Sequence, residues 1–227
     1  MAHEPDNAAA VHSPPAAGGR WAAGEDPVKR QQILDGARRV FMKMGFDAAS
    51  MNDVTREAGV SKGTLYVYFA NKEELFTAMI DIERTNFVAA VRTALSENAD
   101  VASALYEFGM TFVAHMTADK VINAMRTVLG VRERMPNLCQ QFFTGPENLR
   151  TVMIDYLSRQ ITEGRLKIDD IDLAARQFLE LCSGSFFKFR LFGAMETPPS
   201  RDEMNRVICG AVRVFLAAYE VREEKSV

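Results

Sequence analysis

The chain has 227 residues, of which 48% are hydrophobic and 25% are charged, and its formal net charge is -3. These proportions are those of a soluble globular protein, and they exclude a collagen, a low-complexity chain and a chain disordered throughout. No apolar run approaches the roughly 20 residues that span a bilayer, and the N-terminus has no secretory signal, so we expect a cytoplasmic protein. The three cysteines, Cys139, Cys182 and Cys209, follow no metal-ligand spacing and fit reduced thiols in that compartment.

The first part of the chain changes pattern after residue 26. Residues 1–26 are rich in Ala, Pro and Gly without an apolar period, which predicts a disordered arm. From Pro27 onward, apolar residues recur at steps of three and four, which predicts helices. Capping residues delimit four of these helices. They are predicted at residues 28–44, 51–58, 62–69 and 71–95.

The second part of the chain has the same helical pattern. Apolar stripes predict helices at residues 101–116, 121–134, 149–163, 171–192 and 204–216, with a short helical turn at 138–143. No alternating run bounded by turn residues suggests a sheet. We therefore expect an all-α protein with about nine helices.

Basic residues gather in one segment. Between Pro27 and Lys72 there are eight Lys or Arg against four Asp or Glu, a local net charge of +4, which leaves -7 for the remainder. A small basic unit on an acidic body is expected where only that unit meets phosphates. Statistical scatter would also give such an asymmetry, so the charge needs a motif beside it.

The same segment has the pattern of a helix-turn-helix. Ala58 allows two short helices to pack closely, and Gly59 can adopt the positive φ of the tight turn between them. The second helix of such a pair enters the major groove of DNA with its N-terminal residues facing the bases. A generic helical hairpin would share this turn. The residues placed to meet DNA are Lys62, Gly63 and Thr64, then Tyr66 and Tyr68, and Lys72 at the start of the next helix.

Residues 46–76 carry the motif in a specific form. The stretch 58–69, followed by 71–76, closely resembles the signature of tetracycline-repressor (TetR) family regulators. Two looser matches, at residues 135–138 and 174–178, resemble the efflux-type repressors of that family.

The resemblance implies a domain organisation and a set of DNA contacts. It implies a helix-turn-helix DNA-binding domain at residues 27–72 and a ligand-binding and dimerisation domain at 73–222. Val67 departs from the polar or aromatic residue often found at its position, so the resemblance implies no base contact there. The residues implied to contact double-stranded operator DNA are Ser50, Ser61, Lys62, Gly63, Thr64, Tyr66, Tyr68 and Lys72.

The body of the chain has a surplus of large and aromatic side chains. Together with a few polar groups near apolar faces, this surplus predicts a cavity for a small hydrophobic, aromatic effector. Plain core packing is the alternative for each of these residues, and His115 also fits a half-buried histidine without a ligand. The residues predicted to line the cavity are Phe112, His115, Met116, Arg126, Phe142, Phe143, Tyr156 and Phe178.

The last two predicted helices, 171–192 and 204–216, have broad apolar faces interrupted by small residues. Small residues allow close helix approach, so these helices predict a homodimer through a two-fold four-helix bundle, with Val212 in its seam. Packing within one chain is the alternative.

Catalysis has no support in the sequence. We find no nucleophile elbow, no zinc-binding helix motif, no phosphate loop and no dinucleotide fingerprint, so we expect neither an enzyme nor a cofactor or metal site. The function predicted is a dimeric, small-molecule-responsive transcriptional repressor that binds a palindromic operator. A DNA-binding regulator without an inducer is the alternative.

Overall fold

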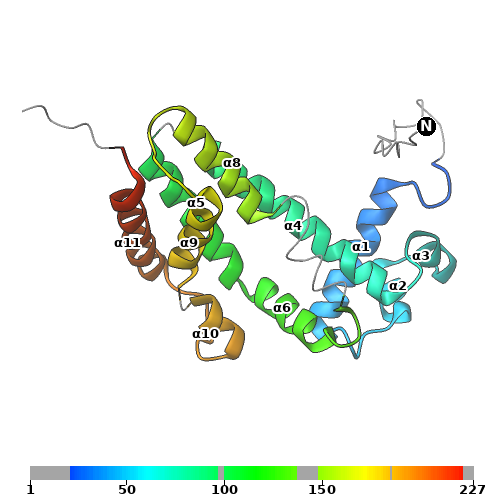
Figure 1. Ribbon diagram of the computed structural model, residues 1–227. Helices are drawn as coiled ribbons and strands as arrows, with labels where there is room; N and C mark the ends of the chain where they lie inside the picture. Colours follow the sequence, from blue (N-terminus) through cyan, green and yellow to red (C-terminus); the bar gives the residue numbers. More distant parts are fainter. Residues whose placement is uncertain (1–20, 97–99, 137–147, 185, 222–227) are drawn as a thin grey trace, which may run out of the picture.

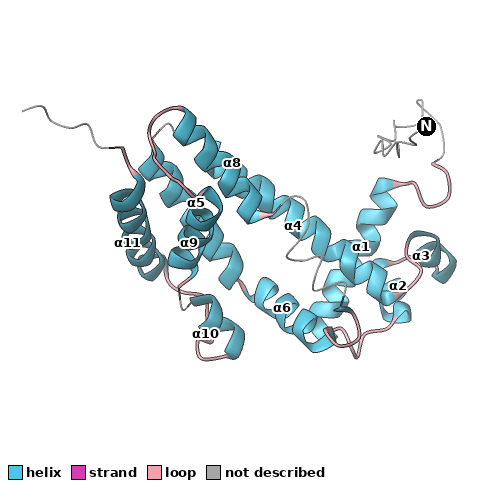
Figure 2. Cartoon of the chain, in the orientation of Figure 1, coloured by secondary structure: helices cyan, strands magenta, loops and turns pink. Residues whose placement is uncertain are grey.

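The chain folds entirely into helices over the residues that the structure describes. The computed structural model describes residues 21–96, 100–136, 148–184 and 186–221, and these contain ten helices and no strand (Figures 1 and 2). The all-α prediction is confirmed. The helices are α1 (Pro27–Met44), α2 (Met51–Ala58), α3 (Lys62–Tyr68), α4 (Lys72–Ser96), α5 (Val101–Thr117), α6 (Asp119–Val131), α8 (Leu149–Thr162), α9 (Ile171–Ser183), α10 (Phe186–Phe192) and α11 (Arg201–Tyr219).

The helices form a small unit and a larger one. The small unit, called the head below, consists of α1, α2, α3 and the N-terminal half of α4, and it lies at one end of the molecule (Figure 1). The larger unit, called the body, contains α5 and α8, which pack on the C-terminal half of α4, and α9 and α11, which pack on α5. Helix α6 runs back from α5 toward the head, and α10 packs on α5 and α6.

Local sequence explains the helix-turn-helix of the head. Ser50 Oγ accepts a hydrogen bond from Asp53 N at 3.2 Å, and the Asp53 carboxylate accepts one from Ser50 N at 3.1 Å, so a capping box starts α2. Gly59 ends α2 in the left-handed conformation, with φ 65° and ψ 37°. Ser61 then caps α3 by accepting from Thr64 N at 3.0 Å. The predicted turn chemistry is confirmed.

Three phenylalanines form the centre of the head. The ring centroids of Phe41, Phe46 and Phe76 lie 4.9–5.6 Å apart in tilted and edge-on arrangements. Val128 and Val131 of α6 belong to the same buried cluster. The head therefore completes its core with two residues of α6, a helix that follows the body helix α5 in the chain.

The core of the body joins three helices through aromatic contacts. The ring centroid of Phe178 in α9 lies 6.1 Å from that of Phe108 in α5 and 5.1 Å from that of Phe215 in α11. All three side chains are at most 1% exposed. This cluster fixes α9 and α11 side by side on α5.

Some predicted helix bounds differ from the structure. The single helix predicted at 171–192 is two helices, α9 and α10, separated at Gly184 with φ 46° and ψ -133°. Glycine adopts such a conformation readily, and the flanking serines favour caps over helix interiors. The helix predicted at 121–134 starts at Asp119 and ends at Val131. The predicted turn at 138–143 and residues 1–20 of the predicted arm lie outside the described residues. Residues 21–26 form a turn that ends at Asp26, the N-cap of α1, rather than the disordered segment predicted for them.

Candidate DNA interface and effector core

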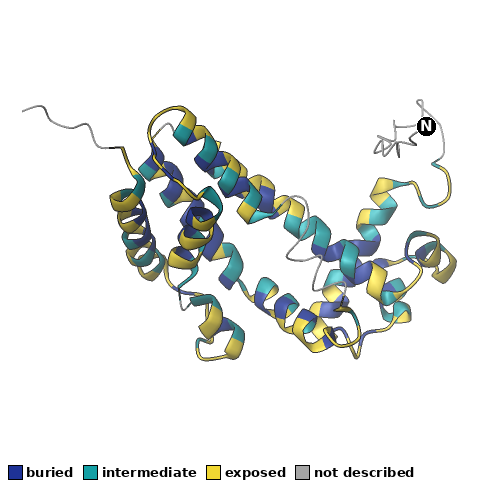
Figure 3. Ribbon diagram, viewed as in Figure 1, coloured by how far each residue is buried: buried dark blue, intermediate teal, exposed yellow. Residues whose placement is uncertain are grey.

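Helix α3 has one buried face and one exposed face. Leu65 is fully buried beneath the helix, whereas Tyr66 is 45% and Val67 is 53% exposed (Figure 3). Lys62 Nζ lies 5.8 Å from the centroid of the Tyr66 ring. The structure thus brings Lys62 and Tyr66 together on the solvent side of α3. Ser61, Gly63, Thr64 and Tyr68 lie at its N-cap and along the same short helix.

Ser50 and Lys72, two further predicted contact residues, hold the protein's own backbone. Ser50 caps α2, and its hydrogen bonds keep the pKa of Asp53 below the ordinary value for that carboxyl. Lys72 Nζ donates to the carbonyl oxygens of Phe46 at 2.7 Å and Ala49 at 3.0 Å, and it lies 4.4 Å from the centre of the Phe46 ring. The ammonium of Lys72 therefore fastens the α1–α2 loop to α4. A phosphate contact by either side chain stays a prediction.

The predicted effector residues lie in different surroundings. Phe112 and Phe178 are buried, and their ring centroids lie 6.0 and 6.1 Å from that of Phe108. The half-buried Met116 packs against the same cluster. Phe142 and Phe143 lie outside the described residues. The described apolar members are thus close together, in the core of the body.

Two polar members of the predicted effector set are held neutral. The His115 ring stacks on Phe87 at a centroid distance of 3.6 Å, and burial, aided by the charge of Lys120, lowers the His115 pKa to about 4. Tyr156 is 3% exposed, and burial raises its pKa to about 12. Near neutral pH both side chains are uncharged, which suits an apolar core.

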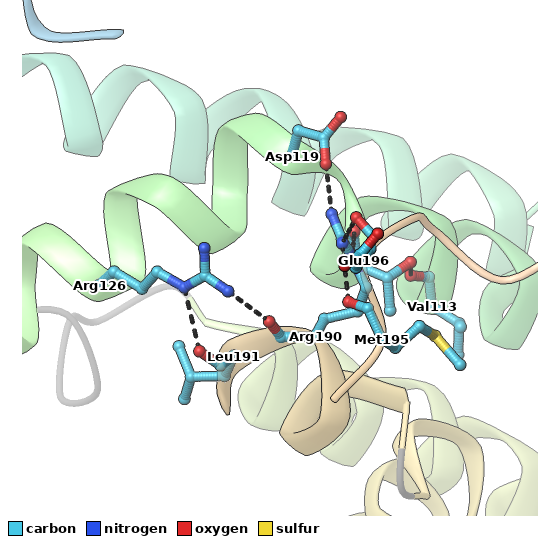
Figure 4. Close-up of polar contacts among 8 residues, drawn as sticks. Val113, Asp119, Arg126, Arg190, Leu191, Met195 and Glu196 are labelled. Carbon is cyan, nitrogen blue, oxygen red and sulfur yellow. Dashed lines mark hydrogen bonds and ion pairs between the residues drawn. The ribbon is translucent and has the colours of Figure 1, made fainter. Parts of the chain in front are cut away.

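Arg126 lies apart from this core and contacts α10. Its guanidinium donates from Nε to the carbonyl oxygen of Leu191 at 3.0 Å and from Nη2 to that of Arg190 at 2.8 Å (Figure 4). These are carbonyls at the C-terminal end of α10, where a cation stabilises the helix dipole. In the structure, the exposed Arg126 thus caps a helix rather than lining the aromatic core.

Arg190 in α10 makes the reciprocal contact and was missed by the sequence reasoning. It is 3% exposed, donates from Nε to the carbonyl oxygen of Thr117 at 3.0 Å, and pairs with Asp119 (Figure 4). It also donates to the backbone carbonyls of Met195 and Glu196. The signal available in the sequence was a lone arginine among phenylalanines. Together, Arg126 and Arg190 bind α10 to α6 and to the α5–α6 junction, and this pair is called the arginine clamp below.

A surface groove of about 500 Å³ lies between α9 and α11 and is lined in part by Leu181, Val214 and Ala218. Leu181 is 38% and Val214 is 52% exposed, so apolar surface remains uncovered on the face predicted to form the dimer. The seam assignment of Val212 is wrong, because this residue is 8% exposed and packs into the protomer's own core. Helix α11 turns Val212 inward and Val214 outward.

The described residues provide neither a cluster of metal-binding side chains nor a membrane-spanning helix. They contain no group of three or more His, Cys, Asp or Glu side chains that could hold a metal ion. None of the described helices combines the length and hydropathy needed to cross a membrane.

Helix α2, the Gly59 turn and the capped, exposed α3, within a segment of net charge +4 at residues 27–72, are the features of a helix-turn-helix transcriptional regulator. The comparisons agree with this class: residues 33–79 match the model of bacterial regulatory proteins of the tetR family. Residues 103–221 match the model of the C-terminal domain of AefR-like transcriptional repressors. The chain belongs to the TetR family, and the predicted resemblance is confirmed.

Curated relatives support this membership to different extents. The transcriptional repressor Rv1474c of Mycobacterium tuberculosis is 29% identical over 155 residues, which cover 67% of this chain and 77% of Rv1474c. The transcriptional activator FasR of Mycolicibacterium smegmatis is 40% identical over 72 residues. That second match spans 32% of this chain and only a third (33%) of FasR.

Solved structures show the same fold over most of the chain. A TetR-family regulator from Mesorhizobium loti superposes with a TM-score of 0.79 at 23% identity, covering 86% of this chain and 98% of that one. The flavonoid-responsive regulator FrrA superposes with a TM-score of 0.66 at 27% identity, covering 86% and 99%. The fold of the family, with an N-terminal helix-turn-helix and a C-terminal helical domain, is therefore the fold of this chain.

Proposed function

We propose that this regulator is a dimeric repressor that binds a palindromic operator and is released from it by a small hydrophobic effector. The observation that carries the proposal is the exposed face of α3, where Lys62 and Tyr66 lie together opposite the buried Leu65. A helix presented in this way fits the major groove, in which lysine contacts guanine edges or phosphates. Sequencing the DNA fragments that the purified protein retains from a random pool would identify the operator.

The effector that we propose is aromatic and apolar. The described part of the body core is rich in phenylalanine, and His115 and Tyr156 sit at or within it as neutral polar groups that can orient a ligand. The likeness to a regulator described as flavonoid-responsive favours the same chemical class, and the two efflux-type sequence matches favour control of an efflux system. Titration of the protein with flavonoids in a thermal-shift assay tests the class.

A regulator without an inducer is the second candidate. The close packing of Phe178 between Phe108 and Phe215 favours it, because such a contact is what a filled core requires. The two candidates differ in linkage: an inducer must weaken operator binding by the factor by which operator weakens inducer binding. A compound that binds without changing operator affinity is no inducer.

Removing the side chain of Tyr66 should weaken operator binding by roughly 1–3 kcal/mol, the typical worth of one good base contact. The expected cause is loss of an exposed ring on α3 that leaves the buried Leu65 and the helix itself untouched. Fluorescence anisotropy with the selected operator measures the effect. Met42→Ala, which removes a 58% exposed side chain from α1, is the matched control and should bind like wild type. Equal operator affinity for Tyr66→Ala and wild type would refute the assignment of α3.

A carboxylate at Val214 should split the dimer. We propose that the groove between α9 and α11 is covered by the same groove of a second protomer. In the Val214→Asp variant, this contact would bury a carboxylate without a partner. Sedimentation should show a dimer for wild type and for Val28→Asp, the same change at a 75% exposed valine of α1, and a monomer for Val214→Asp. A wild-type monomer at micromolar concentration, or a Val214→Asp dimer of unchanged stability, would contradict the bundle.

A further inference from the structure

The segment before α1 is folded by its own hydrogen bonds, which also join it to the N-terminus of α1. Glu25 N donates to the carbonyl oxygen of Ala22 at 3.1 Å, which closes a turn, and Gly24 adopts φ +89° within it. The Asp26 carboxylate accepts from Val28 N at 2.9 Å and from Lys29 N at 3.2 Å, which ties the end of the turn to the first turn of α1. Residues 21–26, called the N-terminal turn below, are therefore an ordered part of the head.

The N-terminal turn lies in contact with the recognition helix. A Cβ built on Gly24 would lie 3.3 Å from both Cγ1 and the carbonyl oxygen of Val67, so the backbone of Gly24 packs on the last turn of α3. Val67 remains 53% exposed, whereas Leu65 is fully buried, so this contact is made on the solvent side of α3. Figure 1 shows the loop that precedes α1 passing beside α3.

The dimensions of DNA indicate which part of the duplex the N-terminal turn contacts when α3 binds. An α-helix with its side chains is about 10–12 Å wide, and the major groove is about 12 Å wide, so α3 fills the groove. We expect a segment that packs on the exposed side of α3 to lie beside the sugar–phosphate strand at the edge of the groove. Trp21 is the half-buried first residue of the turn, and its indole N–H is a donor that suits a phosphate oxygen.

We propose that Trp21 contacts the operator backbone beside the groove read by α3, so that the N-terminal turn is a second DNA-binding element of the head. The inference rests on the proposed operator binding by α3. The match to the N-terminal family model begins at residue 33, so the turn lies outside the part of the head that the model covers. The short side chain of Val67 leaves room for the backbone of Gly24. The contact between the N-terminal turn and α3 thus depends on the residue at which α3 departs from the family pattern.

The composition of the chain provides a direct test. Trp21 is the only tryptophan, so the intrinsic tryptophan emission of the full-length wild-type protein reports on this position alone. Titration with the selected operator duplex should change this emission with the same midpoint as anisotropy of the labelled duplex. Trp21→Ala should bind the duplex roughly threefold to tenfold more weakly, the worth of one hydrogen bond, and Met42→Ala should bind like wild type. Circular dichroism checks that Trp21→Ala keeps the helical fold.

The outcomes separate this inference from the operator proposal. If Tyr66→Ala binds weakly while Trp21→Ala binds with wild-type affinity, the inference is overturned and α3 keeps its role, even where the emission changes. An emission that stays constant at saturating duplex would also overturn it. If neither variant loses affinity, or wild type retains no duplex at all, both proposals fall.

Discussion

Phe178→Ala should lower the free energy of unfolding by about 3–5 kcal/mol, the typical cost of truncating a buried phenylalanine. The ring of Phe178 joins α9 to α5 through Phe108 and to α11 through Phe215, and the side chain is fully buried. Its removal leaves a cavity that the surrounding helices can fill only in part. Urea unfolding at a fixed protomer concentration measures the loss, because the stability of a dimer depends on concentration.

Leu129→Ala is the control for this experiment. Leu129 of α6 is 54% exposed, so its truncation should change the stability by no more than about 0.5 kcal/mol. A Phe178→Ala protein as stable as wild type would mean that the site is already loosely packed. That result would speak for an open effector cavity and against the filled core described above.

Gly36→Ala should destabilise the head by about 1–3 kcal/mol and weaken operator binding more than tenfold. A Cβ on Gly36 would lie 2.6 Å from the Cβ of Ala58 and 2.8 Å from its Cα, and a backbone atom cannot turn aside as a side chain does. Helix α2 must therefore move away from α1, and α3 moves with it out of register with the groove. Thermal unfolding and anisotropy of the operator measure the two effects.

Gly130→Ala is the matched control on a helix with open surroundings. Nothing lies within 4 Å of a Cβ built on Gly130 in α6, so the same substitution should stabilise the protein by up to about 1 kcal/mol. Stabilisation by Gly36→Ala as well would show that α1 and α2 are not in the close contact described here.

The sequence predicted local features of the fold well because they depend on neighbouring residues. Ser50, Gly59 and Ser61 act within a few positions of themselves, and the structure confirms the caps and the turn that they predict. The exposed and buried faces of α11 were harder to assign. Val212 and Val214 are both apolar, and only the position of α5 and α9 decides which of them faces inward.

The surroundings of the polar residues predicted to line the effector cavity could not be assigned from the sequence either. An arginine near an apolar stripe has the same sequence pattern whether it contacts a ligand or the end of another helix. Arg126 reaches carbonyls 64 and 65 residues away in the chain, and such a contact leaves no spacing to find. The break at Gly184, by contrast, depends on a local conformation that a run of Ser, Gly and Ser makes available.

Helix α6 gives the head a second attachment to the body, and the arginine clamp holds that helix to α10. A head joined to the body only through α4 could rotate about the axis of that helix. Helix α6 stops this rotation, since Val128 and Val131 are inserted into the core of the head while Arg126 and Arg190 hold the helix to α10. We expect this second attachment to restrict rotation of α3 before DNA arrives, so that binding has less rotational freedom to restrict. We expect the clamp to contribute torsional stiffness to DNA recognition, rather than added contacts.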